Sequence, residues 1–226
     1  MPIFVLSEDL VFPPAHLATP EGLLAMGGDL EPDRILLAYK NGIFPWYSQG
    51  EPILWWSPNP RMILLPDSFN STKSLNKKIT SKRFQVSLDR CFMQVINLCA
   101  RVRTENGQGT WITAEMIAAY GQLHHLGYAH SVEIWYREEL AGGLYGLSLG
   151  RCFFGESMFS IERDASKVAL YHLCHYLKSK HFEIIDCQVP SDHLKRLGAV
   201  CISRKTFLNK LQRALQYPSL VGPWTL

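Results

Sequence analysis

Residues 129–159, AHSVEIWYREELAGGLYGLSLGRCFFGESMF, constrain the fold more than any other part of the chain. The stretch predicts three short strands, because runs rich in β-branched and aromatic residues are separated by turn-like sequences near 137–139 and 150–151. Gly142 and Gly143 interrupt the second run and predict a bulge or a close approach of another backbone. Strands joined by such short turns pair antiparallel, so this part of the chain forms a meander.

Helical patterns flank this meander. Residues 87–102 and 113–127 carry apolar side chains at helical spacing, and Thr113 is a suitable cap for the second segment. After the meander, residues 164–180 predict another helix and residues 182–189, FEIIDCQV, predict a further strand. This order of elements predicts an α+β domain with a mainly antiparallel sheet and helices packed over it.

The first part of the chain has a different texture. Residues 1 to about 63 are rich in Pro, Gly and Trp and contain one amphipathic segment, EPDRILLAYKNG. We therefore expect a small N-terminal domain over 1–63 and a larger domain over 64–226. With 226 residues, of which 47% are hydrophobic, the chain can bury a substantial core.

Composition argues against several classes of protein. Proline and acidic residues interrupt the first apolar residues, and no apolar run approaches the roughly 20 residues that span a bilayer, so we expect a cytoplasmic protein without a membrane segment. Six cysteines occur without C-x-x-C pairs, so neither disulfides nor a zinc knuckle are expected. His172 and His175 would supply two ligands, whereas a catalytic zinc normally takes three from the protein. We expect no metal.

One segment of the chain is locally basic. The net charge of +3 is too small to indicate a nucleic-acid partner by itself. Between residues 73 and 103, however, cations outnumber acids, namely Lys73, Lys77, Lys78, Lys82, Arg83, Arg101 and Arg103. Such a cluster is either a solvated face or a surface for phosphate groups.

After Glu183, the predicted strand 182–189 contains two polar residues, Asp186 and Gln188, in an apolar sequence. Regular alternation places Asp186 and Gln188 on one face and Cys187 on the other, which disfavours a cysteine nucleophile. A buried carboxylate is costly unless it is paired, and burial raises its pKa. Asp186 is therefore either a group that accepts or orients a proton, or a structural partner of an arginine.

The sequence GESMFS is a second candidate. We expect Glu156 to end one strand and Ser160 to approach the following helix, where free N–H groups can bind a carbonyl or an anion. The string nearly matches the hydrolase pattern G-x-S-x-G, but Phe159 occupies the last position and the order of the other triad residues is missing. Glu156 either binds a substrate ammonium or ties down a loop.

Three strings together indicate a family. They are GLLAMGGDLEPDRILLAYKNGIFPWYSQGEPILWWSPNPR, GTWIT with GESMFS, and IDCQVPSDHLKRLGA. In this order they resemble the bacterial leucyl/phenylalanyl-tRNA–protein transferase family over nearly the whole chain. The resemblance implies a small N-terminal domain joined to a GNAT-like acyltransferase domain. It also implies transfer of Leu or Phe, and less well Met, from aminoacyl-tRNA to proteins with N-terminal Arg or Lys, which marks them for N-degron degradation.

The resemblance also implies roles for individual residues. Asp186 and Gln188 correspond to the family's catalytic pair, with Gln188 near the attacking amine and Asp186 orienting it or drawing its proton away. Glu156 and Ser157 correspond to positions that recognise the ends of the donor or the acceptor.

Further positions correspond to the binding sites for tRNA and the amino acid. Trp46 and Trp111 correspond to aromatic residues that stack on the terminal adenosine, as is common for single-stranded RNA ends. The expected pocket for the donor side chain is apolar and lined by Leu144, Phe153, Leu173 and Leu177. The basic residues Lys73, Lys77, Lys78, Lys82 and Arg83 then gain the tRNA acceptor stem as a partner.

Two alternatives stay open at this point. One is an aminoacyl-tRNA-dependent transferase that acts on another amine, and the other is a tRNA-binding module without catalysis. The resemblance implies no cofactor, and nothing in the sequence suggests more than a monomer.

Overall fold

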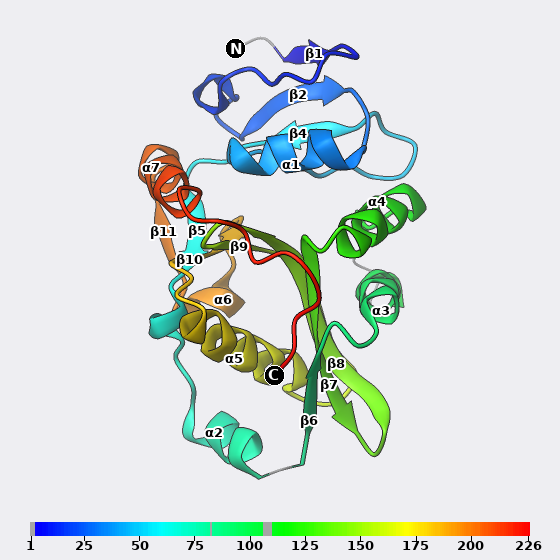
Figure 1. The fold of residues 1–226 in the computed structure, drawn as a ribbon, viewed down its shortest axis with the longest axis vertical. Helices are drawn as coiled ribbons and strands as arrows, with labels where there is room; N and C mark the ends of the chain where they lie inside the picture. The colour runs from blue at the N-terminus through cyan, green and yellow to red at the C-terminus, as the bar shows by residue number, and fades with distance from the viewer. Residues whose placement is uncertain (1–2, 82, 106–109) are drawn as a thin grey trace.

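The computed structural model describes residues 3–81, 83–105 and 110–226, and it contains two sheets (Figure 1). The first sheet has the order β1-β2-β4-β3 and comes from the start of the chain. Its elements are β1 (Phe4–Leu6), β2 (Leu23–Gly27), β3 (Phe44–Pro45) and β4 (Leu54–Trp56), with α1 (Pro32–Lys40) between β2 and β3 and a short 3₁₀ turn at Ala15–Leu17.

The second sheet has seven strands in the order β11-β5-β10-β9-β8-β7-β6. Its neighbours pair antiparallel except β9 and β10, which run parallel. The strands are β5 (Arg61–Leu64), β6 (Gln85–Leu88), β7 (Ala129–Tyr136), β8 (Glu139–Leu149), β9 (Cys152–Ser160), β10 (Ile184–Gln188) and β11 (Val200–Ile202).

Helices cover both faces of the second sheet. They are α2 (Lys73–Thr80), α3 (Phe92–Glu105), α4 (Ala114–His125), α5 (Ala165–Ser179), α6 (Asp192–Arg196) and α7 (Arg204–Ala214), with a 3₁₀ turn at Pro66–Ser68. At Gly142 a Cβ atom would lie 2.5 Å from Ala165 of α5, and at Gly143 it would lie 3.6 Å from Val95 of α3. Since successive strand residues face opposite ways, α5 and α3 pack on opposite faces. The α+β architecture with a mainly antiparallel, helix-flanked sheet is therefore confirmed.

Most of the predicted elements are present. The three-stranded meander is β7, β8 and β9, and its turns fall at 137–138 and 150–151. The hydroxyl of Thr113 accepts a hydrogen bond from the N–H of Met116 and caps α4. No described helix is long and apolar enough to cross a membrane.

The helix expected over 87–102 begins too early in the prediction. Ser87 and Leu88 belong to β6, which pairs with β7, and α3 starts only at Phe92. Asp89 has a positive φ of 53°, and its carboxylate accepts the N–H of Ser131 on β7, so the chain turns there before it enters the helix.

The two sheets suggest where the chain divides. Strand β5 begins at Arg61 and belongs to the second sheet, while β4 of the first sheet ends at Trp56. We therefore propose two domains, as expected from the sequence, with the boundary just before β5. The two parts share one apolar core, because Tyr39 of α1 packs edge-on against Phe154 of β9 at 4.9 Å.

Candidate active site

The candidate site lies where two parallel strands part. β9 and β10 are paired from Cys152 and Ile184 up to Phe154 and Asp186. Past this point the residues of both strands line a pocket of about 280 Å³, together with α5, the start of α6 and the loop around Trp46. The divergence of the strands thus opens the sheet at the position of the polar candidates.

A bulge in β9 carries the first polar group. Along β8, Tyr145 faces Ser157 and the next residue, Gly146, faces Gly155, so Glu156 is an extra residue on β9. A bulge changes the direction of a side chain relative to regular alternation. It places Glu156 in the lining of the pocket. The prediction that the strand ends at Glu156 is wrong, because β9 continues to Ser160.

A second bulge lies in β10. Asp186 faces Ile63 of β5 and Gln188 faces Met62, so Cys187 is the extra residue, and Gln188 has a positive φ of 62°. This bulge overturns the alternation expected from the sequence. Gln188 and Cys187 both line the pocket, whereas Asp186 does not.

Glu156 is buried and accepts hydrogen bonds from three side chains. Its Oε1 accepts from the hydroxyl of Tyr39 at 2.7 Å and from Nε2 of Gln188 at 2.8 Å, and its Oε2 accepts from the hydroxyl of Tyr120 at 3.1 Å. The two tyrosine oxygens are 2.5 Å apart. Burial raises the pKa of Glu156 to about 7, although the three hydrogen bonds act in the opposite direction. Glu156 is thus poised to gain or lose a proton near neutral pH.

The same contacts orient the amide of Gln188. Because Nε2 donates to Glu156, the carbonyl oxygen Oε1 is the end of the amide that is available to a hydrogen-bond donor in the pocket. The strained backbone of Gln188 is held by its N–H, which donates to Oδ1 of Asp186 at 3.0 Å.

Asp186 forms a buried ion pair with Arg61. Nε of Arg61 lies 2.9 Å from Oδ1 and Nη2 lies 2.6 Å from Oδ2, and neither side chain is exposed. Arg61 also donates to the carbonyl of Gly42 at 3.1 Å, and its guanidinium lies over the ring of Phe207 at 4.5 Å. Asp186 therefore lies behind Gln188 and contacts it from outside the pocket.

The remaining lining of the pocket is largely apolar. Leu144, Phe153 and Leu173 line it as expected, whereas Leu177 does not and is buried behind it in the same apolar cluster. The sequence reasoning did not single out several other apolar lining residues, among them Phe44, Met158, Leu170, Ile185, Val189 and Leu194.

Two tryptophans stand at the pocket as expected. Trp46 and Trp111 both line it, and Trp46 is 42% exposed. Trp46 is held by Trp56, whose ring centroid is 5.6 Å away and whose indole N–H donates to the carbonyl of Trp46 at 2.7 Å. Ser157 also lines the pocket, and its buried hydroxyl has no hydrogen-bond partner among the residues that the structure describes.

Two further titratable groups line the pocket. Burial raises the pKa of the Cys187 thiol and lowers the pKa of His193, so both groups are neutral near pH 7. A protonated thiol is a poor nucleophile, so Cys187 is not favoured as a nucleophile even though it lines the pocket. In the described part of the chain, no three His, Cys, Asp or Glu side chains gather to hold a metal ion.

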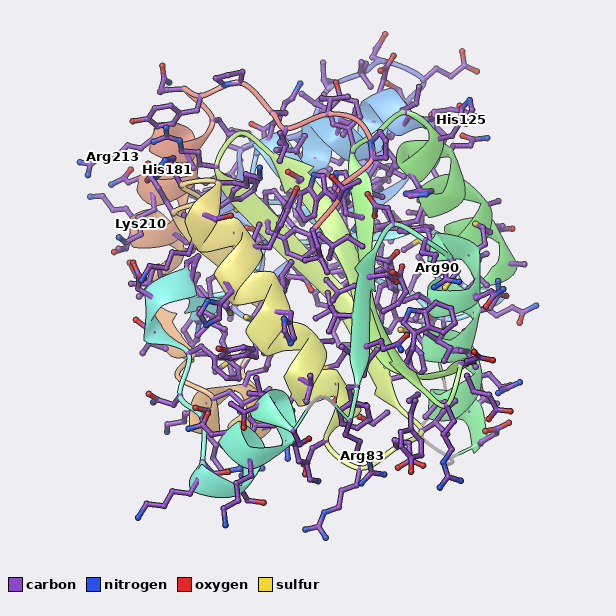
Figure 2. All side chains as sticks on the ribbon, turned by 60° about the horizontal axis from the view of Figure 1, so that its bottom comes forward. Arg83, Arg90, His125, His181, Lys210 and Arg213 are labelled. Atoms are coloured by element: carbon purple, nitrogen blue, oxygen red, sulfur yellow. The ribbon has the colours of Figure 1, made fainter. Side chains whose placement is uncertain are left out.

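The basic residues around α2 have different surroundings. Lys78 forms an ion pair with Asp164, and Arg83 lies 2.7 Å from Glu162. Lys73 and Lys77 are exposed on α2, at the far end of the molecule from the first sheet (Figure 1). Figure 2 shows Arg83 at this same end, and Lys82 lies outside the described residues.

Sequence reasoning missed three residues of the polar network, namely Arg61, Tyr39 and Tyr120. A signal existed for Arg61, because a single cation precedes the apolar run MILL and a single acid interrupts the run IIDC, so each needs a partner. Nothing in the sequence distinguishes Tyr39 and Tyr120 from ordinary core aromatics.

Comparison with known proteins identifies the family. The family sequence model for the leucyl/phenylalanyl-tRNA protein transferase matches residues 63–212. The family sequence model for the N-terminal domain of this transferase matches residues 28–59. The leucyl/phenylalanyl-tRNA–protein transferase of Desulforapulum autotrophicum is 54% identical and covers 99% of this chain and 98% of its own. The transferase of Desulfatibacillum aliphaticivorans is 55% identical and covers 100% of this chain and 97% of its own.

Solved structures give a more distant likeness. An aminoglycoside acetyltransferase from a soil metagenome has a TM-score of 0.39 at 13% identity, over 65% of this chain and 98% of that chain. The matches to the two family models and the full-length identity to curated relatives decide the assignment. The chain belongs to the leucyl/phenylalanyl-tRNA–protein transferase family of aminoacyltransferases.

Proposed function

We propose that this protein transfers Leu or Phe, and less efficiently Met, from aminoacyl-tRNA to the α-amino group of proteins that begin with Arg or Lys. The product would be a destabilising N-terminus in an N-degron pathway. One observation carries the proposal. The hydrogen-bonded pair of Glu156 and Gln188 lies in an apolar pocket that also has Trp46 and Trp111 in its lining.

Gln188 is the residue that we assign to the attacking amine. Attack requires a neutral amine, and an α-amino group has an ordinary pKa of about 8, so it loses its proton at small cost. The carbonyl oxygen of Gln188 would accept a hydrogen bond from this amine and fix its lone pair toward the ester carbon. Positioning of this kind removes much of the barrier to a reaction of two bound partners.

The bonds and protons balance without a further reactant. The amine nitrogen forms a bond with the carbonyl carbon, and the bond from that carbon to the ribose oxygen of the terminal adenosine breaks. The proton from the amine ends on the departing ribose oxygen. The ester is already activated relative to an amide, so alignment rather than a strong base is the main requirement.

Glu156 would bind the α-ammonium of the donor amino acid. A carboxylate offers about four acceptor positions, and described side chains fill three of those on Glu156. The position left on Oε2 suits a charged N–H donor. A cation there would also favour the ionised form of Glu156, because an opposite charge lowers the pKa of a carboxyl group.

Asp186 would act through Gln188 rather than on the substrate. Its two oxygens are engaged by Arg61 and by the backbone of Gln188, and the residue is fully buried. These contacts favour a role in orienting Gln188 over the expected roles of Asp186 toward the amine itself, as its orienting group or its base. They would fix Gln188 in the backbone conformation that aims its amide into the pocket.

The donor's two ends have separate partners in this proposal. The terminal adenosine would stack on Trp46 and Trp111, and such stacking is worth about 1–3 kcal/mol per base. The amino-acid side chain would enter the apolar pocket beside Leu144, Phe153 and Leu173. A cavity of about 280 Å³ is large enough for Leu, Met or Phe.

The acceptor's basic side chain has a candidate position nearby. A second hollow, of about 390 Å³, shares Ser191 with the first pocket, and Asp192 is the only acid among its lining residues. Lys195 lines the same hollow. We place the N-terminal Arg or Lys of the acceptor here, with Asp192 as the partner of its charge.

The tRNA acceptor stem would meet the exposed lysines of α2. Lys73 and Lys77 are exposed and have no ion pair with any described residue, so they are available to phosphates. Lys78 and Arg83 would first have to leave Asp164 and Glu162.

The test is transfer of radiolabelled leucine from Leu-tRNA to two peptides that differ only in an N-terminal Arg or Ala. Label on the Arg peptide alone is the expected result, and pretreatment with ribonuclease should abolish it. Label on both peptides would contradict the proposed acceptor. Binding of tRNA without any transfer would leave a tRNA-binding module instead of an enzyme.

A further inference from the structure

The last residues of the chain form a strap across the second sheet. In Figure 1 the red segment leaves α7, crosses the sheet and ends near α5. Hydrogen bonds fix it at two places before its end. The hydroxyl oxygen of Ser219 accepts the N–H of Gly150 at 2.9 Å, and the N–H of Gly222 donates to the carbonyl of Gly127 at 3.2 Å.

Trp224 anchors the end of this strap. Its side chain is 2% exposed, and its ring stacks on His130 with 3.8 Å between the ring centroids and 7° between the planes. Its backbone N–H donates to Oδ2 of Asp89 at 2.7 Å, and the same oxygen lies 2.8 Å from Nδ1 of His130. Both the ring and the backbone of Trp224 are therefore fixed.

The ring of Trp224 also contacts the wall of the donor pocket. Its centroid is 5.8 Å from that of Phe153, with 41° between the planes, and Phe153 lines the pocket. Phe153 has no room on another side, because a Cβ atom at Gly146 would lie 2.7 Å from its ring. Gly146 and Trp224 thus both limit the space that is open to the Phe153 ring.

We propose that Trp224 is a specificity-determining residue, which sets the depth of the donor side-chain pocket by supporting Phe153 from behind. The inference rests on the proposed function, since it concerns the choice between Leu and Phe as donors. Trp224 would not touch the substrate. It would act as a positioning residue, by preventing the Phe153 ring from moving away from the pocket.

Replacing Trp224 with Ala tests this inference. The change removes the support of Phe153, so a larger donor should fit better relative to a smaller one. We expect the ratio of kcat/KM for Phe-tRNA to kcat/KM for Leu-tRNA, measured in competition, to rise by about tenfold, the size of effect that one methylene has in an apolar pocket. The kcat at saturating Phe-tRNA should change less than twofold, because Glu156 and Gln188 are unaltered.

Two control variants separate pocket depth from loosening of the strap. Tyr217→Ala removes the ring beneath the guanidinium of Arg151, 3.4 Å away, and so loosens the strap without touching Phe153. Leu226→Ala changes a side chain that is 71% exposed. Both should keep the wild-type donor ratio, and a shifted ratio in either one would contradict the role of the Phe153 contact.

A conservative variant keeps the test usable if Trp224→Ala does not fold. Trp224→Phe retains a ring that can stack on His130, and it should give a donor ratio between those of the wild type and the Ala variant. A wild-type ratio in every folded Trp224 variant would overturn the inference. A wild-type enzyme that transfers neither Leu nor Phe would instead overturn the proposed function.

Discussion

The raised pKa of Glu156 predicts a measurable dependence of stability on pH. A carboxyl whose pKa rises from 4.5 in the unfolded chain to about 7 in the folded protein binds its proton more tightly when folded. Between these values the folded state holds more protons than the unfolded state, so the free energy of unfolding falls as pH rises. The stabilising contribution is complete below pH 4.5 and is lost as pH passes through about 7.

The size of this loss follows from the two pKa values. Relative to its value at low pH, the free energy of unfolding falls by about 1 kcal/mol by pH 5, about 2 kcal/mol by pH 6 and about 3 kcal/mol by pH 7. It changes little further above about pH 8. Glu156 is only 8% exposed, so solvent screening reduces the effect little.

Glu156→Gln removes the titration while preserving the shape of the side chain. Its amide oxygen can still accept from Tyr39 and Gln188, and the hydroxyl of Tyr120 can rotate to accept from the new amide nitrogen. We expect the free energy of unfolding of the variant, minus that of the wild type, to rise by about 2 kcal/mol between pH 5 and pH 7.

The assay is urea unfolding followed by tryptophan fluorescence at pH 5, 6, 7 and 8, with both proteins in the same buffers. Taking the difference between two proteins cancels the titration of every group that they share. Glu183→Gln, at an exposed position, removes the same charge and controls for the change in net charge. A difference between Glu156→Gln and wild type that stays constant from pH 5 to pH 8 would refute the reasoning.

The other predictions concern Asp186, Gln188 and the exposed lysines of α2. Asp186→Ala should lower the free energy of unfolding by about 3–5 kcal/mol in urea titrations, because it leaves the guanidinium of Arg61 buried without its partner, and a loss below about 1 kcal/mol would mean that the pair is not closed in solution. Gln188→Ala should lower kcat strongly with little change in tRNA affinity, and unchanged turnover would remove Gln188 from the mechanism. Replacing Lys73 and Lys77 with Ala should weaken tRNA binding and reduce its salt slope by about 2, and an unchanged slope would mark them as solvated surface.

The sequence predicted the strands of the site better than the directions in which their side chains point. The strand 182–189 and the meander that contains Glu156 are both present. The prediction that Asp186 and Gln188 share one face was wrong, because it assumed regular alternation and a bulge separates the two residues. Whether a strand bulges depends on its pairing with neighbours, which a single sequence does not display.

Contacts between residues far apart in the sequence were the least predictable part of the site. The apolar helix residues of α1 and α4 indicated burial, but only the packed structure brings the hydroxyls of Tyr39 and Tyr120 to one carboxylate. The last residues, YPSLVGPWTL, carry no helix or strand pattern, so nothing predicted that Trp224 supports the pocket wall. Both contacts join residues far apart in sequence, and local sequence patterns do not predict such contacts.

The hydrogen bond from Tyr39 of α1 to Glu156 of β9 has a consequence for how the protein is inactivated. Glu156, the proposed partner of the donor ammonium, lies on the second sheet and depends on a hydroxyl supplied by α1, and Trp46, also from the N-terminal part of the chain, lines the same pocket. Any state in which the two sheets separate slightly loses these groups while most of each core stays intact. Heat or denaturant should therefore abolish transfer before the helical circular dichroism signal falls. Loss of activity would then report the loss of contact between the part with the first sheet and the part with the second sheet.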